Sequence, residues 1–380
     1  MKILQTGMGW FGEEAGGLSR YSSGLVSALV AGGDQSRLLV TGSNRVEAMS
    51  GGMAIPFASR EAGTLARMRG SREEFARQLA AFDPDVSTFH FAMYARLSLG
   101  LVRDRPWVCH FHGPWAMESG AEGLMKIGVA AKSYFIEKPV YRAAPRLVTL
   151  SKFFADILRD SFGVPESRIR IVPGGFDPTP FAKAPLKDVA KGLLDLPPNR
   201  PLLVCVRRLT HRMGLENLID AMAIVRREYP DILLAIAGKG PIAGELAKRI
   251  EERGLRGNVR MMGFVPDEVL PALYSAAEFS VVPTVSLEGF GLIVAESLAC
   301  GTPVIATRAG ALPELLESFA PQLLATTPAP ADLARVIDSA LRGTIGLPKP
   351  EACRVHARRW SWEEVVPKLK KVYKEARDCR

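Results

Sequence analysis

The sequence has little cysteine and no long apolar segment. It contains five cysteines in 380 residues, none in a CxxC pair, so it offers neither a disulfide framework nor a zinc-binding signature. No uninterrupted apolar run approaches the roughly 20 residues that a membrane-spanning helix needs. The first residues lack the apolar core of a secretory signal. From these absences we expect a cytoplasmic protein, with peripheral attachment to the inner face of the membrane left open.

Charge of one sign is not concentrated enough to indicate nucleic-acid binding. The net charge is +9, and the excess is spread along the chain. Between 126 and 146 only Glu137 opposes a run of basic residues, namely Lys126, Lys132, Lys138, Arg142 and Arg146. This run is either a solvated helix face or a patch for an anionic membrane surface or an acidic acceptor.

Short β-like runs alternate with amphipathic helical segments from end to end, which is typical of doubly wound α/β domains. The length suits two domains, and a proline-rich, irregular stretch near 177–198 separates two such series. We therefore expect an α/β protein with two Rossmann-like domains. The first predicted domain is 1–183, the second is 184–360, and a helix at 361–380 is expected to pack back on the first domain.

Two glycine clusters compete at the first loop. Gly7, Gly9 and Gly12 form a literal GxGxxG, but the second predicted strand leads into a Gly-Ser-Asn turn without the acidic residue that a dinucleotide ribose requires. The helical periodicity starts after Gly17. Gly16 and Gly17 are therefore better placed to bring backbone N–H groups to a phosphate, and we do not expect NAD or FAD.

Two carboxylates flank a glycine-rich loop in the second half. Glu288 stands before Gly289-Phe290-Gly291-Leu292, and Glu296 lies in the helix that follows. Loop N–H groups there could hold a phosphate. Glu296 has apolar neighbours, and a carboxylate on such a face needs hydroxyl donors or a cation. The alternative is an ordinary turn followed by a solvated helix residue.

This stretch resembles the E-x7-E element of retaining nucleotide-sugar glycosyltransferases of family 4, which have the GT-B fold of two Rossmann-like domains facing each other across a cleft. The resemblance covers nearly the whole chain, and it implies that 1–183 is the acceptor-binding domain and 184–360 the nucleotide-sugar-binding domain. It implies that Glu288 holds the donor sugar and that Glu296 holds the nucleotide ribose. His112, in the segment HFHGPW, matches the histidine near the reacting carbon and donor sugar. Arg208, in RRL, matches the arginine that clamps the donor diphosphate.

By the same resemblance, the diphosphate is expected to contact both glycine loops and Arg208, that is, Gly16, Gly17, Arg208, Gly289, Phe290, Gly291 and Leu292. The family usually carries a lysine where this chain has Met213, whose thioether cannot donate to phosphate. Arg212 is the obvious substitute, and a solvated turn residue is the alternative. The expected catalytic residues are His112, Glu288 and Arg208.

Other candidates have weaker signals. Asp83-Pro84-Asp85 is a literal DxD, but the proline favours a turn. His90 and His110 occur in or beside strands and are expected to be core residues. We therefore predict no metal site and no cofactor, because a nucleotide sugar is a substrate.

The sequence thus predicts a metal-independent retaining hexosyltransferase of polysaccharide or glycoconjugate biosynthesis. The donor would be a UDP-sugar first and GDP-mannose second, and the acceptor a glycan or lipid-linked hydroxyl. A nucleotide-sugar epimerase with the same architecture and a degenerate nucleotide-sugar-binding protein remain alternatives.

Overall fold

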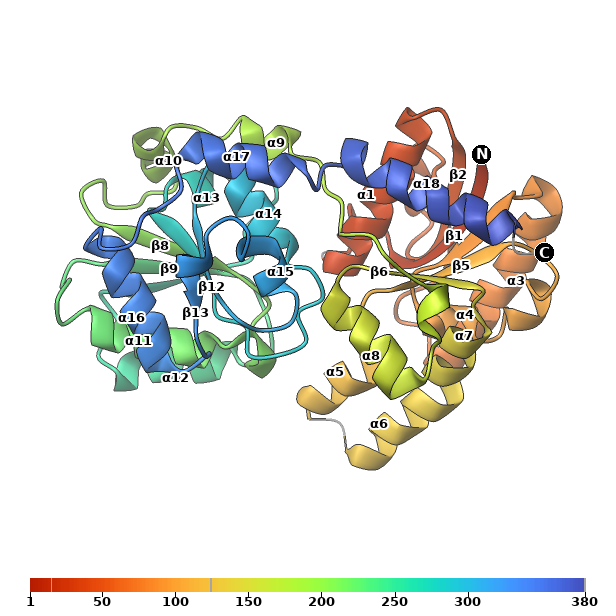
Figure 1. Ribbon diagram of the computed structural model, residues 1–380, viewed down its shortest axis with the longest axis horizontal. Coiled ribbons are helices and arrows are strands. Elements are labelled where there is room, and N and C mark those ends of the chain that lie inside the picture. The colour runs from red at the N-terminus through yellow and green to blue at the C-terminus, as the bar shows by residue number, and fades with distance from the viewer. Residues whose placement is uncertain (15, 124, 379–380) are drawn as a thin grey trace. The chain divides into compact units, whose positions relative to one another are not determined.

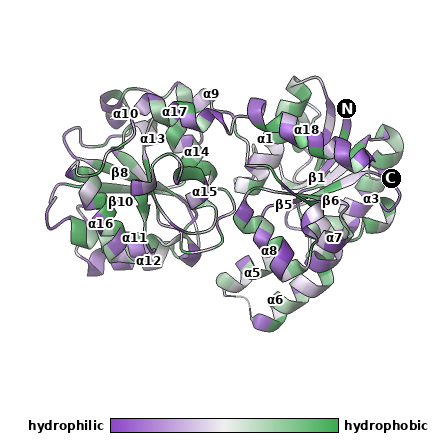
Figure 2. Cartoon of the chain, in the orientation of Figure 1, coloured by the Kyte–Doolittle hydropathy of each residue, from purple (hydrophilic) through white to green (hydrophobic). Residues whose placement is uncertain are grey.

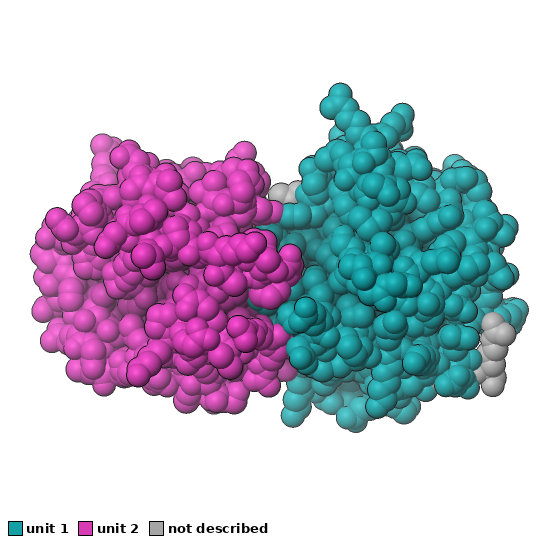
Figure 3. Space-filling model, turned by 90° about the horizontal axis from the view of Figure 1, so that it is seen from above, with its two compact units in different colours: residues 1–176, 360–380 teal, residues 177–359 magenta. Residues whose placement is uncertain are grey.

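A computed structural model describes residues 1–14, 16–123 and 125–378 (Figure 1). The chain forms two compact units, Met1–Phe176 with Trp360–Arg380, and Asp177–Arg359 (Figure 3). The boundary therefore lies before the helix α9 (Thr179–Ala182) rather than at 183/184. This helix belongs to the second unit because it packs on α13 (Leu270–Ser275) and α14 (Leu292–Ala299).

The first unit is built on a seven-stranded parallel sheet of order β3-β2-β1-β4-β5-β6-β7. Its strands are β1 (Lys2–Gly9), β2 (Gln35–Thr41), β3 (Ala54–Ala58), β4 (Val86–Phe89), β5 (Trp107–Phe111), β6 (Arg146–Thr149) and β7 (Ile169–Ile171). The central strands are almost entirely buried, as expected for a parallel sheet that helices cover on both faces.

The longer helices of the first unit bury one apolar face each. They are α1 (Gly17–Ala31), α2 (Val46–Met49), α3 (Thr64–Phe82), α4 (Ala92–Ala95), α5 (Trp115–Ala121), α6 (Lys126–Lys132), α7 (Lys138–Ala143), α8 (Lys152–Phe162) and α18 (Trp362–Asp378), with short turns η1 (Leu99–Leu101), the π-helical η2 (Ser133–Glu137) and η3 (Glu166–Arg168). In α8, for example, Phe154, Leu158 and Phe162 are buried at helical spacing. Figure 2 shows the same banding of hydrophobic and hydrophilic residues along the helices.

The last helix, α18, packs against α1 and against β4, β5 and β6. Trp362, at its start, lies edge-on to Tyr21 and fills the space beside Gly175. A Cβ at Gly175 would come within 2.2 Å of the indole, so this position accepts only glycine. Further along α18, Tyr373 is fully buried and its hydroxyl lies 3.0 Å from Nε2 of His110.

The second unit repeats the plan with a six-stranded parallel sheet of order β10-β9-β8-β11-β12-β13. The strands are β8 (Leu202–Val206), β9 (Leu233–Ala237), β10 (Val259–Gly263), β11 (Phe279–Val282), β12 (Val304–Thr307) and β13 (Leu324–Ala325). The remaining helical segments are α10 (Lys187–Leu193), η4 (His211–Met213), α11 (Leu215–Val225), α12 (Ala243–Glu252), α15 (Leu312–Leu316), η5 (Pro321–Leu323), α16 (Pro330–Leu341) and α17 (Pro350–Arg358).

The predicted pair of Rossmann-like domains is confirmed. In each sheet the strand order reverses once, between β1 and β4 and between β8 and β11. Doubly wound folds bind ligands outside the carboxyl ends of the strands at such reversals. A ligand-binding site is therefore expected at each of these two edges. Across residues 1–14, 16–123 and 125–378, no helix is both long and apolar enough to cross a bilayer.

Candidate functional site

At the β8/β11 edge of the second unit, the loops that follow β8, β11 and β12 are bonded to one another. Val285 N donates to Arg212 O over 2.9 Å, and Ala311 N donates to Glu288 O over 2.9 Å. Gly310 allows the second contact, because a Cβ there would lie 2.2 Å from the Glu288 carbonyl oxygen. The backbone around Glu288 is therefore fixed from both sides before any ligand arrives.

Glu288 is held as a carboxylate by two arginines. Arg207, directly after β8, donates to Glu288 and to Thr284, and both members of this ion pair are largely buried. Burial alone would raise the pKa of Glu288, but the charge and hydrogen bond of Arg207 and the charge of Arg212 together hold it below its ordinary value. The edge thus presents buried positive groups around a carboxylate that stays ionised.

Arg212 lies beside the same loop, with Nη1 donating to the Leu287 carbonyl over 3.2 Å. Its side chain is only 8% exposed, so the interpretation as a solvated turn residue is wrong. Met213, at the position of the family lysine, is buried. Whether Arg212 contacts phosphate stays a prediction, but its guanidinium lies at this loop together with that of Arg207.

The two adjacent arginines differ in position, and sequence reasoning chose only one. Arg208, the residue that matches the family arginine, is exposed, whereas Arg207 carries the contact to Glu288. Because successive residues of an extended strand point to opposite sides, two arginines at a strand end imply one inward and one outward side chain. That signal could have drawn attention to Arg207. The diphosphate role of Arg208 stays a prediction.

Glu296 lies inside α14 and is 3% exposed, so it is not a solvated helix residue. Its Oε2 accepts a hydrogen bond from Tyr274 Oη over 3.1 Å, which supplies the hydroxyl donor that an apolar surrounding demands. The preceding loop is buried at Gly289, Phe290 and Gly291 and half-buried at Leu292. Gly291 has φ 88° where the helix begins. The ribose and diphosphate roles of these residues stay predictions.

At the β1/β4 edge of the first unit, two histidines that follow neighbouring strands are hydrogen-bonded. His90 follows β4 and His112 follows β5, and His90 Nδ1 lies 3.0 Å from His112 Nε2. On the other side, His90 Nε2 lies 2.9 Å from Gln5 Oε1, while Gln5 Nε2 donates to Ser36 Oγ. The sequence did not predict this chain of contacts.

These contacts fix the tautomers. Gln5 presents its oxygen, so His90 donates from Nε2 and accepts at Nδ1 from the N–H of His112. His112 Nδ1 therefore carries no proton and is an acceptor. Burial lowers the pKa of His112 to about 3. Burial, and then the neighbouring His110 and His112, hold the pKa of His90 well below its usual value. At neutral pH this edge is a set of uncharged imidazoles.

His110, from β5, completes a group of three imidazoles whose candidate ligand atoms all lie within 4.8 Å of one another. Such a group can hold a transition metal. Since two of the nitrogens are already bonded to each other, hydrogen bonding alone accounts for the arrangement of His90 and His112. A metal-free site stays a prediction.

The first loop separates the two glycine clusters, and the phosphate role of Gly16 and Gly17 stays a prediction. Gly7 and Gly9 lie within β1, and α1 begins at Gly17, as the periodicity predicted. A Cβ at Gly16 or Gly17 would meet nothing within 4 Å, so this backbone is open to approach. The DxD is a turn: Asp83 ends α3 with φ 44° and Asp85 accepts the amide of Lys2.

Comparison with known proteins agrees with this geometry. The profile of "Glycosyl transferases group 1" matches residues 189–360, and that of "Glycosyltransferase Family 4" matches residues 15–180. The chain belongs to the group 1, family 4-like glycosyltransferases. The two matches correspond to the two units, so each sheet edge described above lies within a matched region.

Curated relatives are enzymes of this family. The chain is 32% identical over 221 residues to a GDP-mannose-dependent alpha-(1-6)-phosphatidylinositol monomannoside mannosyltransferase of Mycolicibacterium smegmatis, covering 53% of this chain and 56% of that protein. It is 28% identical over 335 residues to a D-inositol 3-phosphate glycosyltransferase of Corynebacterium jeikeium, covering 80% and 78%. The match thus spans only about half of the first relative and about four-fifths of the second.

Solved structures show the fold over the whole chain. Anabaena HepE, crystallised with UDP and glucose, aligns with a TM-score of 0.80 at 18% identity over 99% of this chain and 100% of that one. A sucrose-phosphate synthase from Thermosynechococcus elongatus aligns with a TM-score of 0.77 at 21% identity over 100% of both chains. At these identities the alignments show the GT-B fold of this chain. They do not indicate its substrate.

Proposed function

We propose that the chain transfers a hexosyl group from a nucleotide-diphosphate sugar to an acceptor hydroxyl with retention of configuration. The observation that carries the proposal is the pair of buried arginines around ionised Glu288 at the β8/β11 edge. A diphosphate leaving group gains negative charge as the glycosidic bond breaks. Fixed guanidinium and backbone N–H groups stabilise that charge where it develops, so the chain's own groups suffice without a metal.

The proposed reaction is a same-face substitution at the anomeric carbon, which the family resemblance implies. The bond from the anomeric carbon to the diphosphate oxygen breaks, and its electron pair leaves with the diphosphate. The acceptor oxygen bonds to the anomeric carbon, and its proton passes to the departing phosphate oxygen. Glu288 would accept hydrogen bonds from the donor sugar, and Glu296 from the ribose.

His112 would serve the sugar through its unprotonated Nδ1, which accepts a hydroxyl proton in a hydrogen bond. A neutral imidazole suits this role because it adds no charge beside the developing positive charge of the anomeric carbon. His90 would act as a positioning residue, since it holds His112 in the required tautomer.

The donor base is proposed as uracil first, from the habit of the family, and guanine second. The name of the M. smegmatis relative contains GDP-mannose, which supports guanine as the second choice. Product analysis separates the proposal from the epimerase alternative: with donor alone, an epimerase inverts a sugar carbon in the NMR spectrum, and a transferase leaves the donor sugar unchanged.

Titration calorimetry with UDP, GDP, ADP and NAD tests the proposal, using wild type, Glu296→Ala and Tyr274→Phe. We expect one nucleoside diphosphate to bind and Glu296→Ala to weaken it about tenfold or more, in line with a lost charge-assisted hydrogen bond. Tyr274→Phe removes one hydrogen bond to Glu296 but keeps the carboxylate, so it should retain most of the affinity. Binding of NAD alone, or equal loss in both variants, would contradict the ribose assignment.

A further inference from the structure

The segment from Met125 to Phe135 carries large apolar side chains on its outer side. Met125, Ile127, Tyr134 and Phe135 are 75%, 77%, 67% and 64% exposed. Ile127 and Tyr134 are seven residues apart and thus share one side of the helical segment formed by α6 and η2. The rings of Tyr134 and Phe135 meet edge to face at 5.1 Å. Grouped exposed side chains of this size mark an interaction surface.

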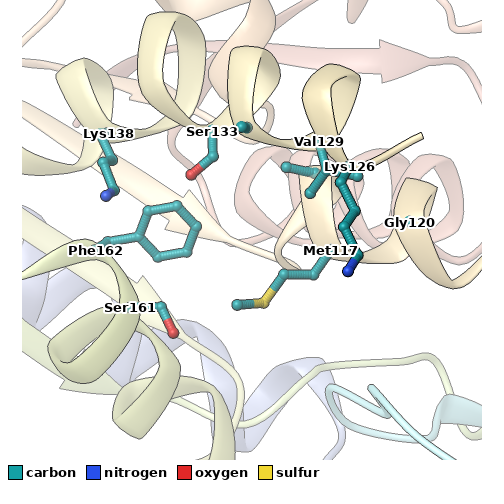
Figure 4. A pocket seen from close by; sticks show the side chains of 10 residues that line it. Met117, Gly120, Lys126, Val129, Ser133, Lys138, Ser161 and Phe162 are labelled. Atoms are coloured by element: carbon teal, nitrogen blue, oxygen red, sulfur yellow. The ribbon is translucent and has the colours of Figure 1, made fainter. Parts of the chain in front are cut away.

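A pocket of about 500 Å³ lies beside this apolar stripe, between α5, α6, η2 and the end of α8. Its floor is apolar, with Met117, Val129 and Phe162. Figure 4 shows the ammonium groups of Lys126 and Lys138 at opposite ends, with Met117 and Phe162 between them. The pocket therefore combines an apolar lining with two cations.

Of the five basic residues between 126 and 146, Lys126 and Lys138 line this pocket. Lys132 donates to Ser119 Oγ over 2.9 Å and lies over the Trp115 ring. Of the other basic residues, Arg142 donates to the Phe162 carbonyl and Arg146 pairs with Glu375. The run is thus not a solvated helix face throughout, because three of its five cations are used inside the unit.

Glu137, the acidic residue within this basic run, is also buried. Glu137 is fully buried, where its carboxylate accepts from Ala116 N over 3.2 Å and from Tyr141 Oη over 3.3 Å. Glu122, directly after α5, is an exposed acid. From 125 to 138 the surface therefore presents apolar side chains and lysines, with no exposed carboxylate in that range.

We propose that this face binds an anionic phospholipid bilayer. Ile127, Tyr134 and Phe135 enter the boundary between head groups and acyl chains, where aromatic and aliphatic side chains partition. A lipid phosphate occupies the pocket between Lys126 and Lys138, whose apolar stems line it while their charges face the head group. Only the further step, that the membrane carries a lipid-linked acceptor, rests on the proposed function.

Vesicle sedimentation tests the proposal with the whole 380-residue chain at low and at physiological salt. Phosphatidylglycerol–phosphatidylcholine vesicles and pure phosphatidylcholine vesicles are compared for wild type, Ile127→Ser/Phe135→Ser, Lys126→Gln/Lys138→Gln and the control Leu65→Ser. Leu65 lies on α3 and is 56% exposed, so the control removes an apolar side chain of similar exposure from another face of the same unit.

We expect wild type and Leu65→Ser to bind anionic vesicles equally. The apolar variant should bind at least tenfold more weakly at both salt concentrations, and the lysine variant should lose the preference for anionic over neutral vesicles. Wild-type binding to neither vesicle, an apolar variant that sediments like wild type, or binding of soluble glycerol phosphate without vesicle binding would overturn the proposal.

Circular dichroism of the same samples verifies that the variants are folded, and nucleoside diphosphate binding separates the two proposals. Vesicle binding without any nucleotide binding would refute the transferase and leave the membrane surface standing. The converse result would refute only the membrane surface.

Discussion

Two buried glutamates, one in each unit, have opposite environments. Glu288 meets two arginines, and its pKa is lowered although it is buried. Glu137 meets a backbone amide and Tyr141, and burial raises its pKa to about 7 despite these hydrogen bonds. The contrast shows that hydrogen bonds do not hold the pKa of buried Glu137 at its ordinary value, whereas a paired guanidinium keeps Glu288 ionised.

The same contrast separates the two sheet edges. The β8/β11 edge is built from charges, and the β1/β4 edge is built from neutral imidazoles whose charged forms are disfavoured by burial. Charged groups suit a diphosphate, and uncharged acceptors suit sugar hydroxyls. The two units share one topology, and the chemistry at the ends of their strands distinguishes them.

Breaking the charged pair should have the largest effect. Arg207→Met leaves Glu288 buried without its main cation, so we expect a loss of about 3–5 kcal/mol in the free energy of unfolding and a fall of roughly 10²–10³ in kcat. Urea denaturation and initial-rate kinetics measure both effects.

The double variant Arg207→Met/Glu288→Gln serves as the control for that experiment. It should recover most of the stability, because no unpaired charge remains, without recovering turnover. If Arg207→Met were as stable as wild type, Glu288 would not depend on this pair.

The second prediction concerns Glu137. Its folded pKa, about 7, exceeds the ordinary value of 4.5, so the folded state binds the extra proton between these values. The stability contributed by the protonated form is complete below pH 4.5 and is lost as the pH rises through about 7. The advantage of Glu137→Gln over wild type should therefore grow by on the order of 3 kcal/mol between pH 4.5 and 8.

Thermal or urea unfolding across this pH range measures the difference, with exposed Glu122→Gln as the matched control. Taking the difference from wild type removes the opposite trend of the histidines. The folded pKa values of the histidines are lowered, so the free energy of unfolding decreases as the pH falls below about 6.5. A difference that does not change with pH would show that Glu137 is not a neutral carboxyl group.

The smallest expected effect lies at the neutral edge. His90→Phe removes the acceptor that holds the N–H of His112, so the two tautomers of His112 can both be populated. We expect kcat to fall about tenfold, or roughly 1.4 kcal/mol, with little change in nucleotide affinity. Nitrogen NMR of His112 reports the tautomer directly, and an unchanged Nε2–H tautomer in the variant would rule out the positioning role.

The alternation of apolar segments was enough to predict two doubly wound domains, and the spacing of Glu288 and Glu296 located the β8/β11 edge. The sequence could not show that His90 lies against His112, because that contact depends on the register of β4 and β5, which pairs Phe89 with Cys109. Register is a property of the packed sheet. In the same way, the inward turn of Arg207 and the internal contacts of Lys132 depend on tertiary packing.

Calorimetry that compares UDP with uridine tests most directly whether the charged edge of the second unit holds a nucleoside diphosphate. If GDP proves to be the preferred nucleotide, GDP and guanosine replace them. The variants are Arg212→Met and, as a control, Arg227→Met, which alters an exposed arginine of the same unit. We predict that wild type and Arg227→Met bind the diphosphate far more tightly than the nucleoside, and that Arg212→Met loses about tenfold or more of this preference while its nucleoside affinity is unchanged. A full preference for the diphosphate in Arg212→Met would contradict the account.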